Sequence, residues 1–171
     1  PITVTSYLSV VSKGAAAFIF TIVVFTVFKN IVELWKPMIY TLAVITMTIG
    51  NLFAMRQNNI KRFLAFSSIA QAGFILLGIL GAGELGMTAI VYFVLVYVFT
   101  NLGAFGVVAA IHNASGVETI SGYNGLYQTN PKLSWLMTIS LFSLAGIPPI
   151  AGFFGKFFLF TAAAGAGDYI L

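Results

Sequence analysis

Apolar runs of about 20 or more residues dominate this chain, and they constrain its fold more than any other feature. Of its 171 residues, 60% are hydrophobic and only 7% are charged, whereas soluble domains contain roughly 25% charged residues. A helix of about 20 apolar residues spans a bilayer, whereas a transmembrane barrel needs alternating apolar and polar positions over about ten residues. The sequence therefore predicts an all-α fold, a polytopic transmembrane helix bundle in contact with the lipid bilayer.

Charged residues divide the chain into about five predicted transmembrane segments, all within a single membrane domain of residues 1–171. Pro37 suits the opening of the second segment, because its missing N–H is not needed there. The fifth segment is too long for one simple span, and two consecutive prolines remove backbone donors inside it, so we expect a break at Gly146–Pro149. Transporters place ion sites at such breaks. The segments cover residues 3–28, 37–55, 63–83, 85–111 and 133–166.

The basic residues predict the orientation of the bundle. The links after the second and fourth segments together carry Arg56, Lys61, Arg62 and Lys132, whereas the link after the first segment carries Lys29 and Lys36. The positive-inside rule therefore places the links after the second and fourth segments on the cytoplasmic or matrix side.

The remaining composition excludes several classes of function. With no Cys and one His, the chain has no residues for a disulfide, an iron–sulfur cluster or a His/Cys metal site. We predict no cofactor-binding residues, no metal ligands and no nucleic-acid partner, and a glycine-containing stretch at residues 81–86 lacks the context of a nucleotide fingerprint. The chain begins without Met and without a signal peptide, so we expect a fragment. We interpret the following as interfacial, loop or helix-end residues: His112, Glu33, Glu84, Glu118 and Asp168.

Lys13 interrupts the first apolar segment, where a charge costs several kcal/mol and usually faces a partner or water. It lies ~16 Å along the helix, too deep for easy snorkelling, although a lysine stem that carries its charge to the interface is the alternative. Hydroxyl side chains share an arc of roughly 120° with it on a helical wheel and can hydrogen-bond an ammonium. These residues are Thr5, Ser6, Ser9 and Ser12.

Lys156 lies seven residues beyond Pro149 among phenylalanines. A lysine in apolar surroundings can change between charged and neutral forms, which an arginine cannot do. An interfacial anchor is the alternative, but the chain stays apolar from Phe157 to Ala166. Lys13 and Lys156 are therefore the predicted proton-transfer residues.

Other polar residues inside the segments are candidates for a proton relay between the two lysines. Such groups in membrane helices more often stabilise helix contacts, which is the competing interpretation for each of them. The candidates are Ser9, Ser68, Gln71, Tyr97 and Thr100.

Three stretches of the sequence resemble a known family. Residues 50–80 (GNLFAMRQNNIKRFLAFSSIAQAGFILLGIL), 101–108 (NLGAFGVV) and 143–160 (SLAGIPPIAGFFGKFFLF) resemble the N subunit of proton-pumping NADH:quinone oxidoreductase, respiratory complex I. This family of antiporter-like membrane subunits contains two inverted repeats, each with a broken helix and a membrane-embedded lysine. The resemblance implies that this chain is the second repeat, that Lys13 is its connecting lysine and that Lys156 is the lysine of its broken helix. Gln71 stands where many relatives have His, so a relay through an imidazole does not apply there.

The resemblance implies a proton-translocating subunit of an enzyme complex, in which quinone reduction elsewhere drives proton transfer through buried lysines. NADH, FMN, iron–sulfur clusters and quinone would then lie in other subunits, and the partners would be other membrane-arm subunits, with protons and water as the only small substrates. The expected location is an energy-conserving membrane. The bacterial plasma membrane is the preferred expectation, and the mitochondrial inner membrane is the alternative. The alternatives are a cation/proton antiporter subunit, a membrane-bound hydrogenase subunit, and a non-conducting scaffold.

Overall fold

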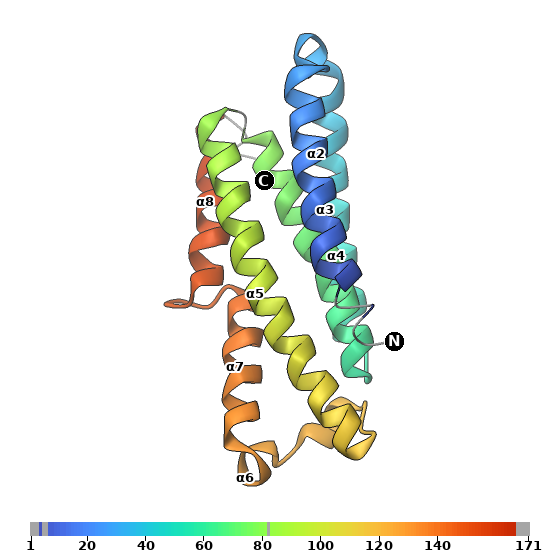
Figure 1. The fold of residues 1–171 in the computed structure, drawn as a ribbon. Helices are drawn as coiled ribbons and strands as arrows, with labels where there is room; N and C mark the ends of the chain where they lie inside the picture. The colour runs from blue at the N-terminus through green and yellow to red at the C-terminus, as the bar shows by residue number, and fades with distance from the viewer. Residues whose placement is uncertain (1–3, 5–6, 82, 167–171) are drawn as a thin grey trace.

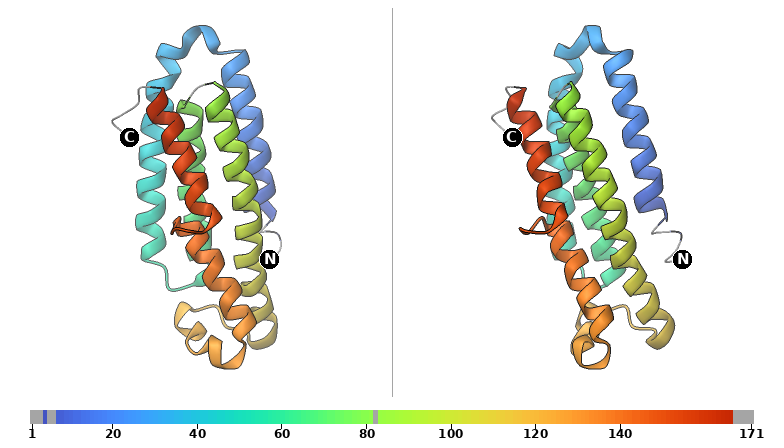
Figure 2. Two further views of the ribbon diagram at one scale, coloured as in Figure 1. Left: turned by 90° about the vertical axis from the view of Figure 1, so that its left-hand side faces the viewer. Right: turned by 60° about the vertical axis from the view of Figure 1, so that its left-hand side comes forward.

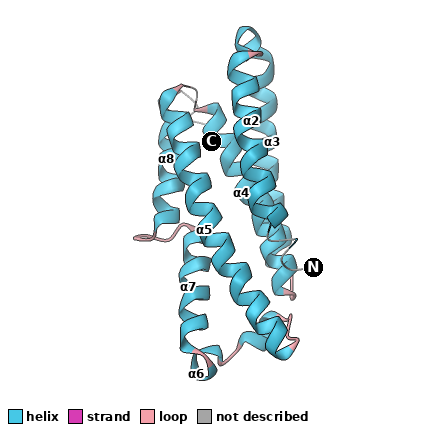
Figure 3. Ribbon diagram, in the orientation of Figure 1, coloured by secondary structure: helices cyan, strands magenta, loops and turns pink. Residues whose placement is uncertain are grey.

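The computed structural model of the chain describes residues 4, 7–81 and 83–166, and these residues are almost entirely helical (Figures 1 and 3). The described part contains no strand, only an isolated antiparallel bridge between Asn59 and Thr119. The all-α prediction is therefore confirmed. In chain order the elements are a π-helical turn η1 (Leu8–Ser12), α2 (Lys13–Thr26), a 3-10 turn η2 (Lys29–Ile31), α3 (Val32–Met55), α4 (Ile60–Leu80), α5 (Glu84–Ser115), a 3-10 turn η3 (Ile120–Tyr123), α6 (Leu126–Thr129), α7 (Pro131–Ala145) and α8 (Ala151–Gly165).

Three described helical stretches are long and apolar enough to cross a membrane on their own: Lys29–Met55, Ile60–Leu80 and Glu84–Ser115. Two shorter apolar stretches, Val10–Thr26 and Ala151–Gly165, accompany them. The first predicted segment starts at residue 3, outside the described residues. The number of membrane crossings and the single-domain assignment stay predictions.

The predicted break in the last segment is confirmed. α7 ends at Ala145, Gly146 adopts a left-handed conformation with φ of 81°, and α8 begins only at Ala151. Glycine takes this conformation without the steric cost that a Cβ brings. At its other end α7 starts with Pro131 in the first helical turn, and the Asn130 side chain accepts a hydrogen bond from the Leu133 N–H at 3.2 Å.

The prediction that Pro37 opens the second helix is wrong, because α3 begins at Val32 and includes Pro37. Glu33 lies in the first turn of α3, where a negative charge interacts favourably with the helix dipole. Because proline has no N–H, Pro37 cannot donate a hydrogen bond to the Glu33 carbonyl. The missing hydrogen bond lies near the exposed start of a long helix, and α3 tolerates its loss.

α4 and α5 occupy the centre of the bundle (Figures 1 and 2). α3 packs extensively against α4, while α8 and α7 follow one another along α5. The backbone of α2 comes less close to its neighbours, although Ala17, Thr21 and Val24 on this helix are buried. The broken pair α7 and α8 thus brings its break beside the middle of α5.

Glycines bring α3 and α4 into backbone contact. A Cβ at Gly50 would lie 2.7 Å from the Ala70 nitrogen, and a Cβ at Gly73 would lie 3.0 Å from the Met47 nitrogen. Small residues allow this close approach between membrane helices. We call these four residues the glycine seam.

The buried apolar residues form two clusters, one at each end of the α4–α5 pair. The first includes Ile75 and Phe93, and the second includes Leu64 and Ala104. The middle of α4 and α5 lies between these positions, and its buried side chains include several polar ones. These polar residues are Ser68, Gln71 and Asn101, together with Tyr97, which also belongs to the second cluster.

Candidate functional site

Lys13 is the first residue of α2 and directly follows the π-helical turn η1. Its Nζ donates to the Ser68 hydroxyl oxygen at 2.7 Å and to the Ser68 carbonyl oxygen at 2.9 Å. π-Helical turns are rare and frequently occur at functional sites. The structure thus joins two predicted site residues, Lys13 and Ser68 of α4, by hydrogen bonds, although they are 55 positions apart in the sequence.

Lys156, on α8, reaches back to the end of α7. Its Nζ donates to the carbonyl oxygens of Leu144 at 2.7 Å and Ala145 at 3.2 Å. The last carbonyls of a helix have no intrahelical partner and carry partial negative charge, so an ammonium stabilises them. The ring of Phe74 on α4 lies 4.5 Å from the same Nζ and adds a cation–π contact.

The geometry of the break makes room for this lysine. A Cβ at Gly146 would lie 2.9 Å from the Lys156 Cδ atom, and a Cβ at Gly152 would collide with the Ser143 carbonyl oxygen. The two glycines therefore let the start of α8 and the stem of Lys156 approach the end of α7.

The expectation of two buried lysines is not shown, because Lys13 and Lys156 are both half-buried among the described helices. Each ammonium is directed to oxygens inside the bundle. A long aliphatic stem allows this while part of the side chain lies at the surface of the described helices.

Hydroxyl groups continue from Ser68 into α5. The side chain of Tyr97 interacts with those of Ser68 and Asn101, and all three residues are buried. The Ser68 hydroxyl accepts a hydrogen bond from Lys13 and donates one to the Ala65 carbonyl at 2.7 Å. A group that both accepts and donates a hydrogen bond can take part in proton transfer.

Gln71 lies at the Lys156 end of the site. Its Nε2 donates to the Leu144 carbonyl oxygen at 3.2 Å, the oxygen that also accepts from Lys156. Thr100 lies close by, with its Oγ1 3.0 Å from the Ser143 Oγ of α7.

A small cavity of about 10 Å³ separates the two ends of the site. This volume corresponds to about a single water molecule. Its wall is mainly apolar, although polar residues from both ends are among those that line it. Its lining comprises Gln71, Phe93, Val96, Tyr97, Thr100, Ser143, Leu144 and Gly152.

The structure thus brings together six of the seven predicted site residues. The side chain of Ser9 lies outside the description, as do Thr5, Ser6 and Asp168. The sequence prediction missed Ser143 and the Leu144 carbonyl. Ser143 sits three residues before Gly146, so the predicted helix break was the signal that could have indicated it. Among the described residues, no group of three or more His, Cys, Asp or Glu side chains could hold a metal ion.

Comparisons with known proteins agree on one family. A family model described as "NADH:quinone oxidoreductase/Mrp antiporter, TM" matches residues 1–171. Over 173 aligned residues the chain is 53% identical to the NADH-quinone oxidoreductase subunit N of Phocaeicola vulgatus, covering 100% of this chain and 36% of that protein. It is 43% identical over 171 residues to the NAD(P)H-quinone oxidoreductase subunit 2 of a Synechococcus species, covering 100% of this chain and 33% of that protein. The chain therefore spans about a third of the length of these curated relatives.

Proposed function

Because the chain belongs to the transmembrane family of NADH:quinone oxidoreductases and Mrp antiporters, we propose that it is part of subunit N of a proton-pumping NADH:quinone oxidoreductase and transfers protons between Lys13 and Lys156. The names of its relatives support the subunit assignment. In this proposal the NADH, FMN, iron–sulfur and quinone chemistry takes place in other subunits, and the chain sits in a bacterial plasma membrane among the other membrane-arm subunits.

The observation that carries the proposal is the cavity between Tyr97 and Leu144. On one side Tyr97 connects through Ser68 to the ammonium of Lys13. On the other side the Leu144 carbonyl contacts the ammonium of Lys156. A single water in this cavity would bridge Tyr97 and the Leu144 carbonyl. Because a carbonyl accepts hydrogen bonds but donates none, the last proton transfer has to go from the water to Lys156 itself.

The Lys156 end of the path requires a movement. Lys156 does not line the cavity, and its ammonium is bound to the Leu144 and Ala145 carbonyls. To receive a proton from the cavity water, Lys156 has to be in its neutral form and has to leave the Leu144 oxygen, because an ammonium has no lone pair that can accept a proton. Gln71 stays hydrogen-bonded to that oxygen and keeps it satisfied while the lysine moves.

A scaffold role is the second candidate, and one observation favours it. Lys156 supplies donors to carbonyls at the end of α7 that have no helical partner. A residue that only caps a broken helix would do the same. The proton-transfer role requires Lys156 to release its proton, whereas the scaffold role does not.

Replacing Lys156 with Arg separates the two candidates. Arginine keeps the positive charge and the donors but does not release its proton at physiological pH. We expect Lys156→Arg to stop proton pumping by the assembled complex, measured in membrane vesicles as protons moved per NADH oxidised. Lys156→Met is the second variant. Lys29→Arg, at the exposed end of the bundle, is the control. Full pumping by an assembled Lys156→Arg complex would contradict proton transfer and favour the scaffold.

A further inference from the structure

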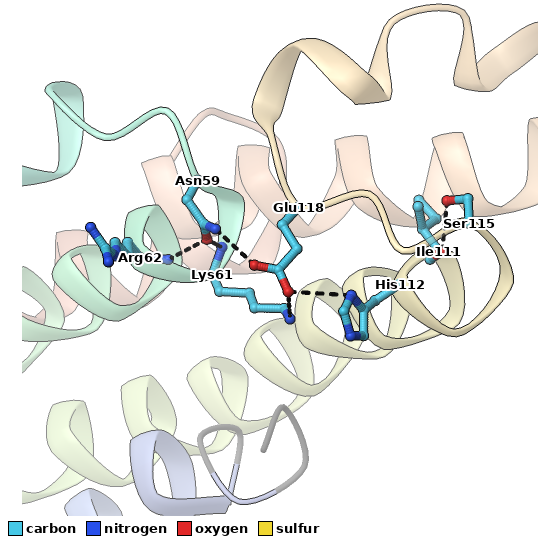
Figure 4. A network of polar contacts seen from close by, with 7 residues as sticks. All are labelled: Asn59, Lys61, Arg62, Ile111, His112, Ser115 and Glu118. Atoms are coloured by element: carbon cyan, nitrogen blue, oxygen red, sulfur yellow. Dashed lines mark hydrogen bonds and ion pairs between the residues drawn. The ribbon is translucent and has the colours of Figure 1, made fainter.

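The structure balances the charges of its lysines in two ways. At the start of α4, Lys61 donates to the Glu118 carboxylate, and the Asn59 side chain donates to the same carboxylate at 3.0 Å (Figure 4). Among the described residues, no carboxylate forms an ion pair with Lys156. The positive charge of Lys156 is therefore stabilised by neutral groups, and an aromatic ring is one of them.

The contacts of the Lys156 ammonium do not depend equally on its charge. The carbonyl oxygens of Leu144 and Ala145 accept hydrogen bonds from it, and a neutral amine, which keeps two N–H groups, can donate to them as well. The ring of Phe74, whose centroid lies 4.5 Å from the Nζ atom, attracts a cation through the negative face of its π-system. This attraction is lost when the lysine is neutral. The ring is therefore the contact that depends most on the positive charge.

Neighbouring aromatic side chains hold the Phe74 ring in place. Phe93 of α5 is buried, and its ring centroid lies 6.3 Å from that of Phe74. Phe160 of α8 makes a T-shaped contact with Phe74, with the ring centroids 6.0 Å apart. Phe160 follows Lys156 by four residues, so both side chains lie on the same face of α8. One face of α8 thus brings the lysine and an aromatic neighbour to the same ring of α4.

The Phe74 ring lies outside the small cavity of the candidate site. Phe93, which contacts Phe74, belongs to the lining of this cavity, whereas Phe74 and Lys156 do not. The cation–π contact therefore belongs to the position that the charged lysine occupies at the helix break. The cavity is the place that a neutral lysine has to reach in the proposed proton transfer.

We propose that Phe74 is a positioning residue that holds the charged form of Lys156 outside the cavity and does not hold the neutral form. In the proposed transfer, the neutral amine takes a proton from the cavity water with its lone pair, and the water takes one from the path that begins at Lys13. The ammonium that forms is then attracted back to the ring and the carbonyls. This inference rests on the proposed function, because it assigns a role in the transfer to Lys156.

Fluorinated phenylalanines at position 74 test the inference in the assembled complex. Fluorine atoms weaken the negative face of the ring, while the ring keeps nearly the same shape. We expect pumping per NADH oxidised to fall in steps as one, two and three fluorine atoms are added, by about twofold to fivefold in all. The matched control is Phe66 on the same helix, whose ring stacks on Phe53. Equal pumping with all of the fluorinated rings at position 74 would overturn the proposal.

Two ordinary substitutions separate the charge dependence from packing. Phe74→Leu keeps an apolar side chain but removes the ring, so pumping should fall by about the same twofold to fivefold. Phe74→Tyr keeps an aromatic face and should restore most of the pumping that Phe74→Leu loses. An equal loss in the two variants would indicate a packing role alone and would overturn the proposal.

The proposed function and this inference fail in different ways. If Lys156→Arg stops pumping but the fluorinated rings do not change it, the role of Phe74 is overturned and proton transfer through Lys156 stands. If Lys156→Arg pumps fully, both are overturned. A double-mutant cycle of Phe74→Leu and Lys156→Met on the unfolding temperature tests the contact without pumping. Effects that are not additive support the contact, and additive effects overturn it.

Discussion

Lys13 and Lys156 bind their partners in different ways. The ammonium of Lys13 contacts a hydroxyl and a carbonyl of one residue, Ser68, within an otherwise continuous helix. The ammonium of Lys156 contacts two carbonyls that the end of α7 leaves without helical partners. The first contact therefore depends mainly on a replaceable side chain, whereas the second is a consequence of the break in the backbone. The two lysines should therefore respond differently to substitution.

The largest expected effect comes from Lys156→Met. We expect proton pumping to fall by about tenfold or more, equivalent to a barrier about 1.4 kcal/mol higher. We also expect the free energy of unfolding to fall by about 0.5–1.5 kcal/mol, the net value of one hydrogen bond, because the exposed Ala145 carbonyl loses its donor. Pumping in vesicles and thermal unfolding of the purified assembly measure the two quantities.

Lys13→Met is the matched comparison for this variant. It should reduce pumping as strongly but leave stability nearly unchanged, because the Ser68 hydroxyl keeps its hydrogen bond to Ala65. Equal losses of stability in the two variants would contradict the difference that we infer.

Gly146→Ala tests whether the backbone positions Lys156. A residue with a Cβ in the left-handed conformation costs roughly 1–2 kcal/mol, and the Cβ would also approach the Lys156 Cδ atom at 2.9 Å. Gly116→Ala is the control, because Gly116 has a similar φ of 69° with open space around its Cβ position. Gly146→Ala should therefore lower the unfolding temperature more than Gly116→Ala does, and equal shifts would refute a role for the Lys156 contact.

Ser68→Ala tests the side-chain contact of Lys13. It removes the hydroxyl but leaves the Ser68 carbonyl as an acceptor, so we expect a severalfold loss of pumping, consistent with about 1 kcal/mol for one hydrogen bond. The neighbouring Ser67→Ala serves as the control. A pumping rate in Ser68→Ala that matches Ser67→Ala would remove the hydroxyl from the path.

The smallest expected effect belongs to Tyr97→Phe. The variant keeps the ring stacked on Phe93 and removes only the hydroxyl that faces Ser68 and Asn101. We expect about a twofold to threefold slower transfer with normal assembly, because water can replace one hydroxyl in a hydrogen-bonded path. Tyr92→Phe, in the apolar groove between α5 and α8, should show no change in the same assay.

The sequence was sufficient to predict the helical class and the broken last segment, and it named most of the residues that the structure brings together at the candidate site. Continuous apolar runs and the Pro148–Pro149 pair have direct physical consequences for the backbone, so these predictions depend little on tertiary contacts. The start of α3 was predicted too late, because proline is tolerated beyond the first turn when the freed carbonyl is exposed.

The partners of the two lysines could not be predicted from the sequence. The contact of Lys13 with Ser68 joins segments far apart in the chain, and the partner of Lys156 is a backbone carbonyl that any residue could supply. The cluster at Glu118 was likewise interpreted as isolated loop charges, because its members come from separate parts of the chain: Asn59, Lys61, His112 and Glu118.

The glycine seam determines which part of the bundle can act as a mechanical element. Backbone contact at Gly50 and Gly73 leaves α4 no freedom to rotate or slide against α3 without a steric clash. Ser68 is therefore carried on a helix that is held in place, whereas α2 makes few close backbone contacts with the rest of the bundle. The Lys13–Ser68 contact therefore depends on the position of α2, because a displacement of α2 against α4 would separate the two side chains.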